Sequence, residues 1–352
     1  MSLQAATVRL LGPILLMLLS GCSDSPPDTK PVRIQGQTFG TFYQVSLATD
    51  LDEARKSGLR RRLEEELDRV DRQMSTYRDD SDLNRLNRAN VGEWVPLPEP
   101  VIRLLARSRK ISGATGGAFD VTVGGLVNLW SFGPEARPRE KPSDQLLQQR
   151  LDQVGFRKLE IDGEADRARR LSDVYVDLSA IAKGYAVDRL ATVLEDAGYE
   201  AYLVNIGGDL LARGRKRSGE HWRIGIELPR DAEQVARHAL PLEDMSLATS
   251  GDYRNYFEAN GRRYSHTIDP RDGRPVQHRL ASASVFHPEN TMADALATAF
   301  MVMGTEEALA HARRREIGVL LIERRDGGFR TRLSPAMDDI LPRDAIERIL
   351  TD

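Results

Sequence analysis

The sequence predicts a mixed α/β (α+β) fold, built as a single large domain of two packed lobes. Segments with the apolar period of a helix are interspersed with short alternating or fully apolar segments typical of strands. After the N-terminal region, no clear linker, internal repeat or low-complexity segment divides the chain. These two observations favour one domain over several.

The first half is predicted to open with a strand and to continue with helices. Residues 38–47 alternate apolar with polar side chains, the period of a half-buried strand. A helix is expected where apolar residues recur at helical spacing, at Leu59, Leu63, Leu67, Val70 and Met74. Pro100 opens a second expected helix, and residues 146–154 form a third after a proline-rich loop.

The second half is predicted to alternate strands and helices. Strands are expected over residues 174–178, 202–206, 222–228, 281–286 and 319–322. Helices are expected over residues 180–197, 292–303 and 306–315. Gly198 and Gly304 directly follow the first two of these helices, which is a common way for a helix to end.

The N-terminus has the pattern of a secretory signal. Arg9 precedes a mostly apolar run that is too short to span a bilayer as a helix. Small residues then lead to Cys22, the only cysteine in 352 residues, as in bacterial lipoprotein signals. That resemblance implies a signal peptide over 1–21, an acylated Cys22 and a flexible tether over 22–36, which would anchor the protein to a bacterial cell membrane, facing the periplasm. The alternative is an ordinary signal peptide with a chance cysteine.

Composition and missing motifs exclude several classes of protein. Without further cysteines, the mature domain has no disulfides and no cysteine metal ligands. A formal charge of -3 gives no basic footprint for nucleic acid. No GxxxxGK[ST] and no GxGxxG after a strand occur, so neither a P-loop nor a Rossmann site has support.

Residues 265–276, SHTIDPRDGRPV, form the segment richest in chemical groups. It carries His266, Asp269, Asp272 and two arginines, and apolar residues are nearly absent. Its prolines and Gly273 predict a constrained loop, and rigid loops dense in titratable groups are frequent sites of function. A solvated hairpin turn is the alternative interpretation.

Two helices carry groups suited to phosphate and metal. In DLSAIAKGYAVD (177–188), a helix start is expected with Lys183 one turn into the helix, a combination that suits a phosphate. The alternative interpretation is an ordinary helix cap with an exposed lysine. In MADALATAF (292–300), Asp294 and Thr298 lie four residues apart and share a helix face. Their hard oxygen atoms suit Mg²⁺. The alternative interpretation is a carboxylate near the N-terminus of the helix and a buried threonine, without a metal.

Two further segments carry isolated polar groups. Asp120 lies among glycines and apolar residues in residues 116–133, so its carboxylate is either capped by backbone N–H groups or binds a ligand. Ser75, Thr76 and Tyr77 follow an expected helix. An exposed tyrosine on a turn can stack on a flat ring, or it can cover the core.

Together with QTFGT (37–41), these segments resemble the FAD:protein FMN transferases, the ApbE family of flavin transferases. The match follows the order of the family from Gln37 to Thr298, weakly beyond, and covers most of the mature chain. The resemblance implies an ApbE-like, T-fold-like catalytic domain over 37–352 that binds FAD in a cleft between lobes. It also implies transfer of FMN to a threonine of a target protein with release of AMP, where electron-transfer subunits at the membrane are the expected targets.

The resemblance also implies roles for particular residues. The Mg²⁺ ligands would be the carbonyl of Ala180 and the side chains of Asp294 and Thr298. The flavin contacts would be Phe39, Ser75, Thr76, Tyr77, Asp120, Lys183, Thr267 and Ile268. Two positions depart from the family pattern: Phe39 replaces a usual methionine, and Ala297 replaces a second aspartate of some members. These departures put the affinities for flavin and metal in question.

The chemistry of such a transfer gives each group a task. A threonine hydroxyl is a weak nucleophile until a base takes its proton, and His266 titrates near neutrality. Asp269 is a second candidate base or an orienting partner for the imidazole, and His266 could instead contact flavin or phosphate. Lys183 would assist Mg²⁺ in stabilising charge on phosphate oxygens. The alternatives are an FAD pyrophosphatase, with water replacing threonine, and a non-enzymatic flavin-binding lipoprotein.

Overall fold

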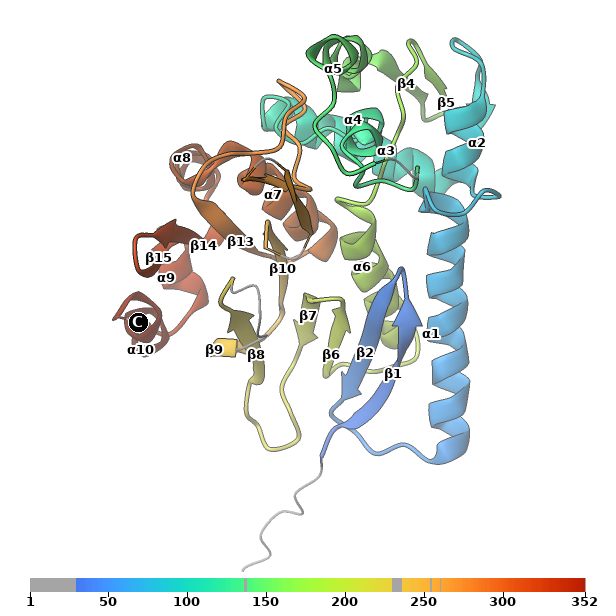
Figure 1. Cartoon of the computed structure of the whole chain (residues 1–352). Coiled ribbons are helices and arrows are strands. Elements are labelled where there is room, and N and C mark those ends of the chain that lie inside the picture. Colours follow the sequence, from blue (N-terminus) through green and yellow to red (C-terminus); the bar gives the residue numbers. More distant parts are fainter. Residues whose placement is uncertain (1–29, 136–137, 230–235, 254, 260, 352) are drawn as a thin grey trace, which may run out of the picture. The chain divides into compact units, whose positions relative to one another are not determined.

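The structure is a computed structural model (Figure 1) that describes residues 30–135, 138–229, 236–253, 255–259 and 261–351. Pro31–Asp352 form one compact unit, in which the two expected lobes are not separate units. The predicted signal peptide, Cys22 and most of the tether lie outside the described residues. Within those ranges, no helix has the length and apolar character needed to cross a membrane.

An antiparallel sheet of eight strands is the centre of the fold, in the order β1-β2-β6-β7-β10-β13-β14-β15. Its strands are β1 (Val32–Thr38), β2 (Thr41–Leu47), β6 (Tyr202–Ile206), β7 (Asp209–Arg213), β10 (Met245–Gly251), β13 (Leu280–His287), β14 (Gly318–Arg325) and β15 (Gly328–Leu333). Together with the helices below, this confirms the mixed α/β class. The antiparallel pairing makes it an α+β arrangement.

The first predicted strand is one half of a hairpin. Phe39 and Gly40 have positive φ angles of 50° and 71°, which turn the chain between β1 and β2. Ile34 of β1 is fully buried and pairs with Val45 of β2. Residues 32–36 are therefore part of the sheet and not of the tether, because burial of Ile34 and the ladder hydrogen bonds hold them there.

Helices α6 (Ala182–Glu195) and α7 (Asn290–Met303) cross each other and pack against the sheet, and α1 (Glu53–Met74) packs on α6 (Figure 1). Gly184 permits the crossing, because a Cβ there would lie 2.4 Å from the Asn290 carbonyl oxygen. Asp188 of α6 accepts hydrogen bonds of 2.8 Å from the N–H groups of Asn290 and Thr291. Its carboxylate therefore caps the start of α7 and fixes it to α6.

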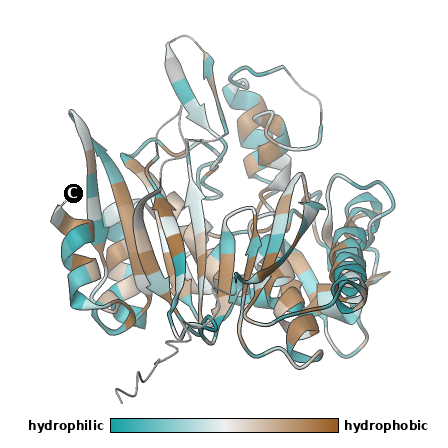
Figure 2. Ribbon diagram, turned by 90° about the horizontal axis from the view of Figure 1, so that it is seen from below, coloured by the Kyte–Doolittle hydropathy of each residue, from teal (hydrophilic) through white to brown (hydrophobic). Residues whose placement is uncertain are grey.

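A second core lies between the main sheet and a separate hairpin, β8 (Trp222–Glu227) with β9 (Ala236–Leu242). Along β8, buried Trp222, Ile224 and Ile226 alternate with more exposed residues, as the sequence pattern predicts. Figure 2 displays such alternation as brown and teal bands along the strands. The short helices α9 (Met337–Ile340) and α10 (Arg343–Thr351) complete this core, and α8 (Thr305–Arg315) packs beside α7.

The remaining elements are those drawn at the top and upper right of Figure 1, together with a hairpin of β11 and β12. They are α2 (Asp82–Arg88), α3 (Glu99–Ala114), α4 (Gly124–Leu129), α5 (Asp144–Leu151), η1 (Phe156–Lys158), β3 (Val95–Pro96), β4 (Leu159–Asp162), β5 (Arg167–Arg170), β11 (Tyr256–Ala259) and β12 (Arg262–Ser265). The strand predicted over 174–178 is wrong: only Tyr175 pairs, in an isolated bridge with Val123. Its apolar side chains are instead part of the core, because Val174, Val176 and Leu178 are buried.

Candidate functional site

A pocket of about 970 Å³ lies where the main sheet, the start of α6, α7 and the loop after β12 meet. Residues of β2, β6, β7, β8, β10 and β13 also line it, as do residues 118–121. This volume is at the upper end of the range for small-molecule sites, so it suits a ligand of dinucleotide size.

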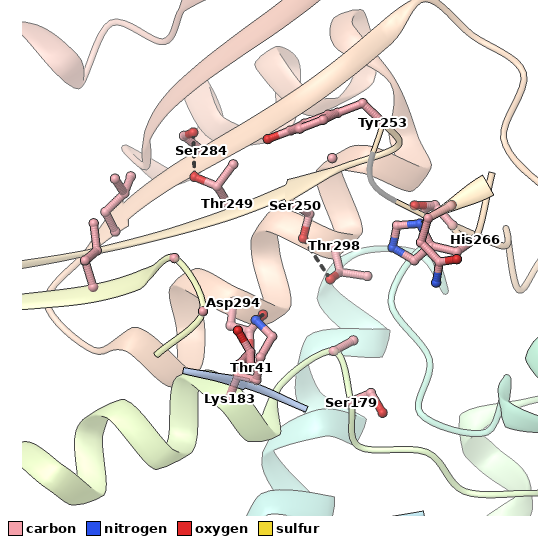
Figure 3. A pocket seen from close by; sticks show the side chains of 18 of the residues that line it. Thr41, Ser179, Lys183, Thr249, Ser250, Tyr253, His266, Ser284, Asp294 and Thr298 are labelled. Carbon is pink, nitrogen blue, oxygen red and sulfur yellow. Dashed lines mark hydrogen bonds and ion pairs between the residues drawn. The ribbon is translucent and has the colours of Figure 1, made fainter. Parts of the chain in front are cut away.

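Three charged side chains from different elements meet at the wall formed by α6 and α7. Lys183 of α6 forms an ion pair with Asp209, the first residue of β7, and its Nζ lies 3.9 Å from Oδ1 of Asp294. Asp209 and Asp294 are 1% and 4% exposed. Figure 3 shows Lys183 beside Asp294. The lysine therefore contributes a positive charge between two buried carboxylates.

The first turn of α6 holds the carboxylate of Asp294. The Gly184 N–H, one of the first N–H groups of α6 that have no partner within the helix, donates to Oδ2 of Asp294 at 2.9 Å. Burial, with a smaller contribution from nearby Asp209, raises the pKa of Asp294 to about 7, although Lys183 and the Gly184 N–H act in the opposite direction. A protein carboxylate thus accepts from one of the N–H groups at the helix start that the sequence predicted for a phosphate.

Hydroxyl groups line the wall above this charged cluster (Figure 3). Ser250 of β10 and Thr298 of α7 lie 3.2 Å apart between their hydroxyl oxygens, and Thr249 and Ser284 lie 2.8 Å apart. Asp294 and Thr298 both line the pocket from consecutive turns of α7, as their spacing predicts. The site therefore presents several neutral oxygens close to one buried carboxylate.

His266 lines the pocket from the loop after β12, and one backbone carbonyl fixes its ring. Its Nδ1 lies 3.0 Å from the Asn255 carbonyl oxygen, which also accepts the His266 backbone N–H at 3.0 Å. A carbonyl can only accept, so Nδ1 carries the proton and Nε2 is the acceptor nitrogen. Burial lowers the pKa of His266, so the neutral ring with a basic Nε2 is favoured at neutral pH.

Asp269 does not orient the His266 ring, which corrects that expectation. Its carboxylate forms an ion pair with Arg271, with 2.8 Å between the closest atoms, and it is not among the residues that line the pocket. The prolines and Gly273 turn the loop back on itself. The Asp269 N–H donates to the Arg274 carbonyl, and the Asp269 carbonyl accepts from the Gly273 N–H. The loop after Ile268 is thus the hairpin-like turn of the alternative interpretation, while His266, Thr267 and Ile268 line the pocket.

Asp120 lines the pocket with its carboxylate capped from within the protein. One oxygen accepts from the N–H and hydroxyl of Thr122 at 2.8 and 2.7 Å, and the other accepts from the Phe156 N–H at 2.7 Å. Burial raises the pKa of Asp120, although these hydrogen bonds act in the opposite direction. The flavin contact expected of Asp120 stays a prediction.

The remaining predicted contacts separate into two groups. Tyr77, 70% exposed, and Ala180 line the pocket. Ser75 ends α1 and accepts from the Tyr77 N–H at 3.1 Å, and Thr76 is buried; neither lines the pocket. Phe39 packs against the core beneath the β1–β2 turn, and the pocket is lined there by Thr41 and Phe42 instead.

Sequence reasoning missed several polar residues of the site: Asn205, Asp209, Thr249, Ser250, Tyr253 and Ser284. Asp209 had a usable signal, since an acidic residue directly follows a buried strand and Gly207-Gly208. The hydroxyls of β10 and β13 had none, because only the pairing of these strands brings them together.

Comparison with known sequences identifies the family. A model of the ApbE family matches residues 39–321. A Vibrio cholerae protein named FAD:protein FMN transferase is 40% identical over 328 residues, covering 93% of this chain and 97% of its own length.

Solved structures agree. The flavin transferase ApbE from Vibrio cholerae has a TM-score of 0.81 and 39% identity to this chain, covering 89% of it and 99% of its own length. The apo form of the Pseudomonas stutzeri flavinyl transferase ApbE also has a TM-score of 0.81, at 41% identity, covering 89% of this chain and 97% of its own. With the matched segment spanning most of the chain, this protein belongs to the ApbE family.

Proposed function

We propose that this protein is an FAD:protein FMN transferase, which moves FMN from FAD to a threonine hydroxyl of a target protein and releases AMP. One observation carries the proposal: Lys183, Asp294, Thr298 and His266 line one pocket of dinucleotide size. The relatives named FAD:protein FMN transferase support the same activity.

The residues at the α6–α7 crossing fit a divalent cation such as Mg²⁺. Across the described ranges, no three His, Cys, Asp or Glu side chains gather as a metal site, so the donors would be mixed oxygens. They are the Asp294 carboxylate, the Thr298 hydroxyl and the Ala180 carbonyl, from three residues that all line the pocket. Mg²⁺ suits a few protein oxygens completed by phosphate and water, and when bound it would neutralise charge on phosphate oxygens.

The protein's own groups then have defined tasks in the transfer. The threonine oxygen attacks the phosphorus on the FMN side of the diphosphate, the anhydride P–O bond breaks, and AMP leaves with the bridging oxygen. Nε2 of His266 takes the hydroxyl proton, since Nδ1 donates to the Asn255 carbonyl. Lys183 places positive charge beside the diphosphate, where negative charge grows during the reaction.

The proposal is tested with purified protein, FAD, Mg²⁺ and a candidate exported electron-transfer target. Intact-mass spectrometry should find one FMN added to a target threonine, with AMP formed in equal amount and both lost with chelator. AMP and FMN formed without a target would instead support an FAD pyrophosphatase. Tight FAD binding with no turnover, unaffected by Asp294→Ala, would support a flavin-binding lipoprotein. Either result would overturn the transferase proposal.

The proposal includes a lipid anchor at Cys22 that holds the domain at the bacterial membrane, facing the periplasm. It rests on the sequence pattern of residues 9–22, which precede the described residues. Metabolic labelling with a fatty acid should mark the wild-type protein and not Cys22→Ser. Equal labelling of both proteins would contradict the anchor.

A further inference from the structure

We infer that Asp209 is a positioning residue that holds the Lys183 ammonium away from Asp294, so that the Asp294 carboxylate stays open to a divalent cation. The inference rests on the proposed function and adds a residue to it. Asp209 differs from the other members of the charged cluster because it does not line the pocket, whereas Lys183 and Asp294 do. Asp209 therefore makes no direct contact with a ligand in the pocket, and it touches the lining of the pocket through Lys183.

The geometry places the ammonium between two buried carboxylates but much closer to one. Lys183 is in direct ion-pair contact with Asp209, while its Nζ is 3.9 Å from Oδ1 of Asp294. The Lys183 side chain is 35% exposed, so its head group lies at the edge of the pocket, with Asp209 behind it. The two aspartates come from different elements, β7 and α7, and both elements contact α6, which carries Lys183.

The same distances predict where the Lys183 ammonium would move if Asp209 were replaced by a neutral residue. Asp294 is also within ion-pair distance of the Lys183 ammonium, at 3.9 Å, and its opposite charge attracts that ammonium. A charge-assisted N–H···O bond is about 2.7–2.9 Å long, so a shift of about 1 Å along the flexible lysine would close the gap. The ammonium would then donate a hydrogen bond to Oδ1 of Asp294. Oδ1 is the oxygen that stays open to a divalent cation, because Oδ2 accepts from the Gly184 N–H. Two cations would compete for one oxygen.

The test compares Mn²⁺ binding, by electron paramagnetic resonance without FAD or target, in five proteins: wild type, Asp209→Asn, Asp209→Glu, Lys183→Met and the double variant of Asp209→Asn with Lys183→Met. Asp209→Asn should weaken Mn²⁺ binding by about 10- to 100-fold, as is usual for residues that orient metal ligands. The double variant should recover at least wild-type affinity, because the competing ammonium is gone. Asp209→Glu, which keeps the negative charge, should retain part of the Mn²⁺ affinity that Asp209→Asn loses.

Each other outcome overturns the inference. Unchanged Mn²⁺ binding in Asp209→Asn would mean that Lys183 does not move onto Asp294. Weak binding in both Asp209→Asn and the double variant would mean that Asp209 acts by its own negative charge. If the wild type itself fails to bind Mn²⁺, no cation site forms without the nucleotide and the inference is wrong, whereas the transfer proposal is judged separately by the addition of FMN to the target. Thermal unfolding of all five proteins separates loss of binding from loss of fold.

Discussion

The Gly184 N–H donates to the Asp294 carboxylate across 2.9 Å, at the point where α6 and α7 cross. This bond ties the helix that carries Lys183 to the helix that carries Thr298. It is possible only because residue 184 lacks a side chain, since a Cβ there would lie 2.7 Å from Cβ of Asp294. The arrangement of the charged cluster thus depends on a close approach of two helices.

Replacing Gly184 by alanine should therefore damage stability and site together. The added methyl group would lie 2.4 Å from the Asn290 carbonyl oxygen, which is backbone and cannot rotate away. We expect a loss of about 1–3 kcal/mol in unfolding free energy, measured by urea denaturation, from overpacking of this crossing. Transfer activity should fall in the same protein because Asp294 loses its hydrogen bond.

Gly58→Ala is the matched control for that substitution. Gly58 lies within α1, and a Cβ there would meet no atom within 4 Å. Alanine in an open helical position should raise stability by about 0.5–1 kcal/mol and leave activity unchanged. Equal effects of Gly58→Ala and Gly184→Ala would contradict the importance of the α6–α7 approach.

The buried Asp294 should make stability depend on pH when no divalent cation is present. Its folded pKa is about 7, above the ordinary value of about 3.9 for aspartate. Between these values the folded state holds a proton that the unfolded state has lost, so unfolding free energy falls as pH rises from about 4 to about 7. Urea denaturation across this range should show the fall for the wild type and not for Asp294→Asn. An identical pH dependence of the two proteins would refute this assignment.

Binding of a divalent cation should reverse the fall in unfolding free energy that accompanies ionisation of Asp294. An ion that binds the folded carboxylate and not the unfolded chain stabilises the folded state by mass action. Mg²⁺ at neutral pH should therefore raise the unfolding midpoint of the wild type and leave Asp294→Asn unaffected. Stabilisation of both proteins by Mg²⁺ would place the ion elsewhere.

His266 should act as a base in its neutral form. Burial lowers its pKa below the ordinary value of about 6.5, so kcat/KM should rise with pH, with a midpoint below that value, and then level off. His266→Gln should reduce transfer by about 100- to 10,000-fold and remove this rise, while FAD binding is retained. His221, which does not line the pocket, provides a control as His221→Gln. Weaker FAD binding in His266→Gln at unchanged kcat would favour a ligand contact instead.

Tyr77 should contribute to FAD binding as an exposed aromatic ring at the pocket wall. It is 70% exposed, and stacking on a flat ring would cover it. Tyr77→Ala should raise the Kd for FAD by about 2- to 10-fold in a fluorescence titration, whereas Tyr77→Phe should match the wild type. Leu171→Ala, an exposed position outside the pocket, should have no effect. Unchanged affinity in Tyr77→Ala would remove Tyr77 from the flavin site.

Local patterns predicted the elements whose own residues carry a clear period. The strands β6, β8 and β13 and the helix α7 lie close to their predicted ranges, because each has a regular apolar face. β7 and β10 were missed. β10, MSLATSG, has mostly small and polar residues, and only its two neighbours β7 and β13 make it a central strand. Long-range pairing of that kind is absent from the local sequence.

The same distinction applies to the site. Asp294 and Thr298 could be placed together because one helix carries both, and Lys183 because it begins another helix. The hydroxyls of Thr249 and Ser284 could not, because their positions depend on which strands are neighbours. The signal at Asp209 marked a polar residue after a strand but did not indicate that it meets Lys183. The sequence likewise could not indicate that the Asn255 carbonyl orients His266, since β11 and β12 must pair to bring them together.

The most direct test is the anomalous difference map of crystals grown with Mn²⁺ and FAD. We predict a peak about 2.1 Å from oxygens of Asp294, Thr298 and Ala180, with the FAD diphosphate completing the coordination. A nucleotide bound with its diphosphate away from the α6–α7 crossing, or an ion bound at other residues, would contradict the proposed transfer site.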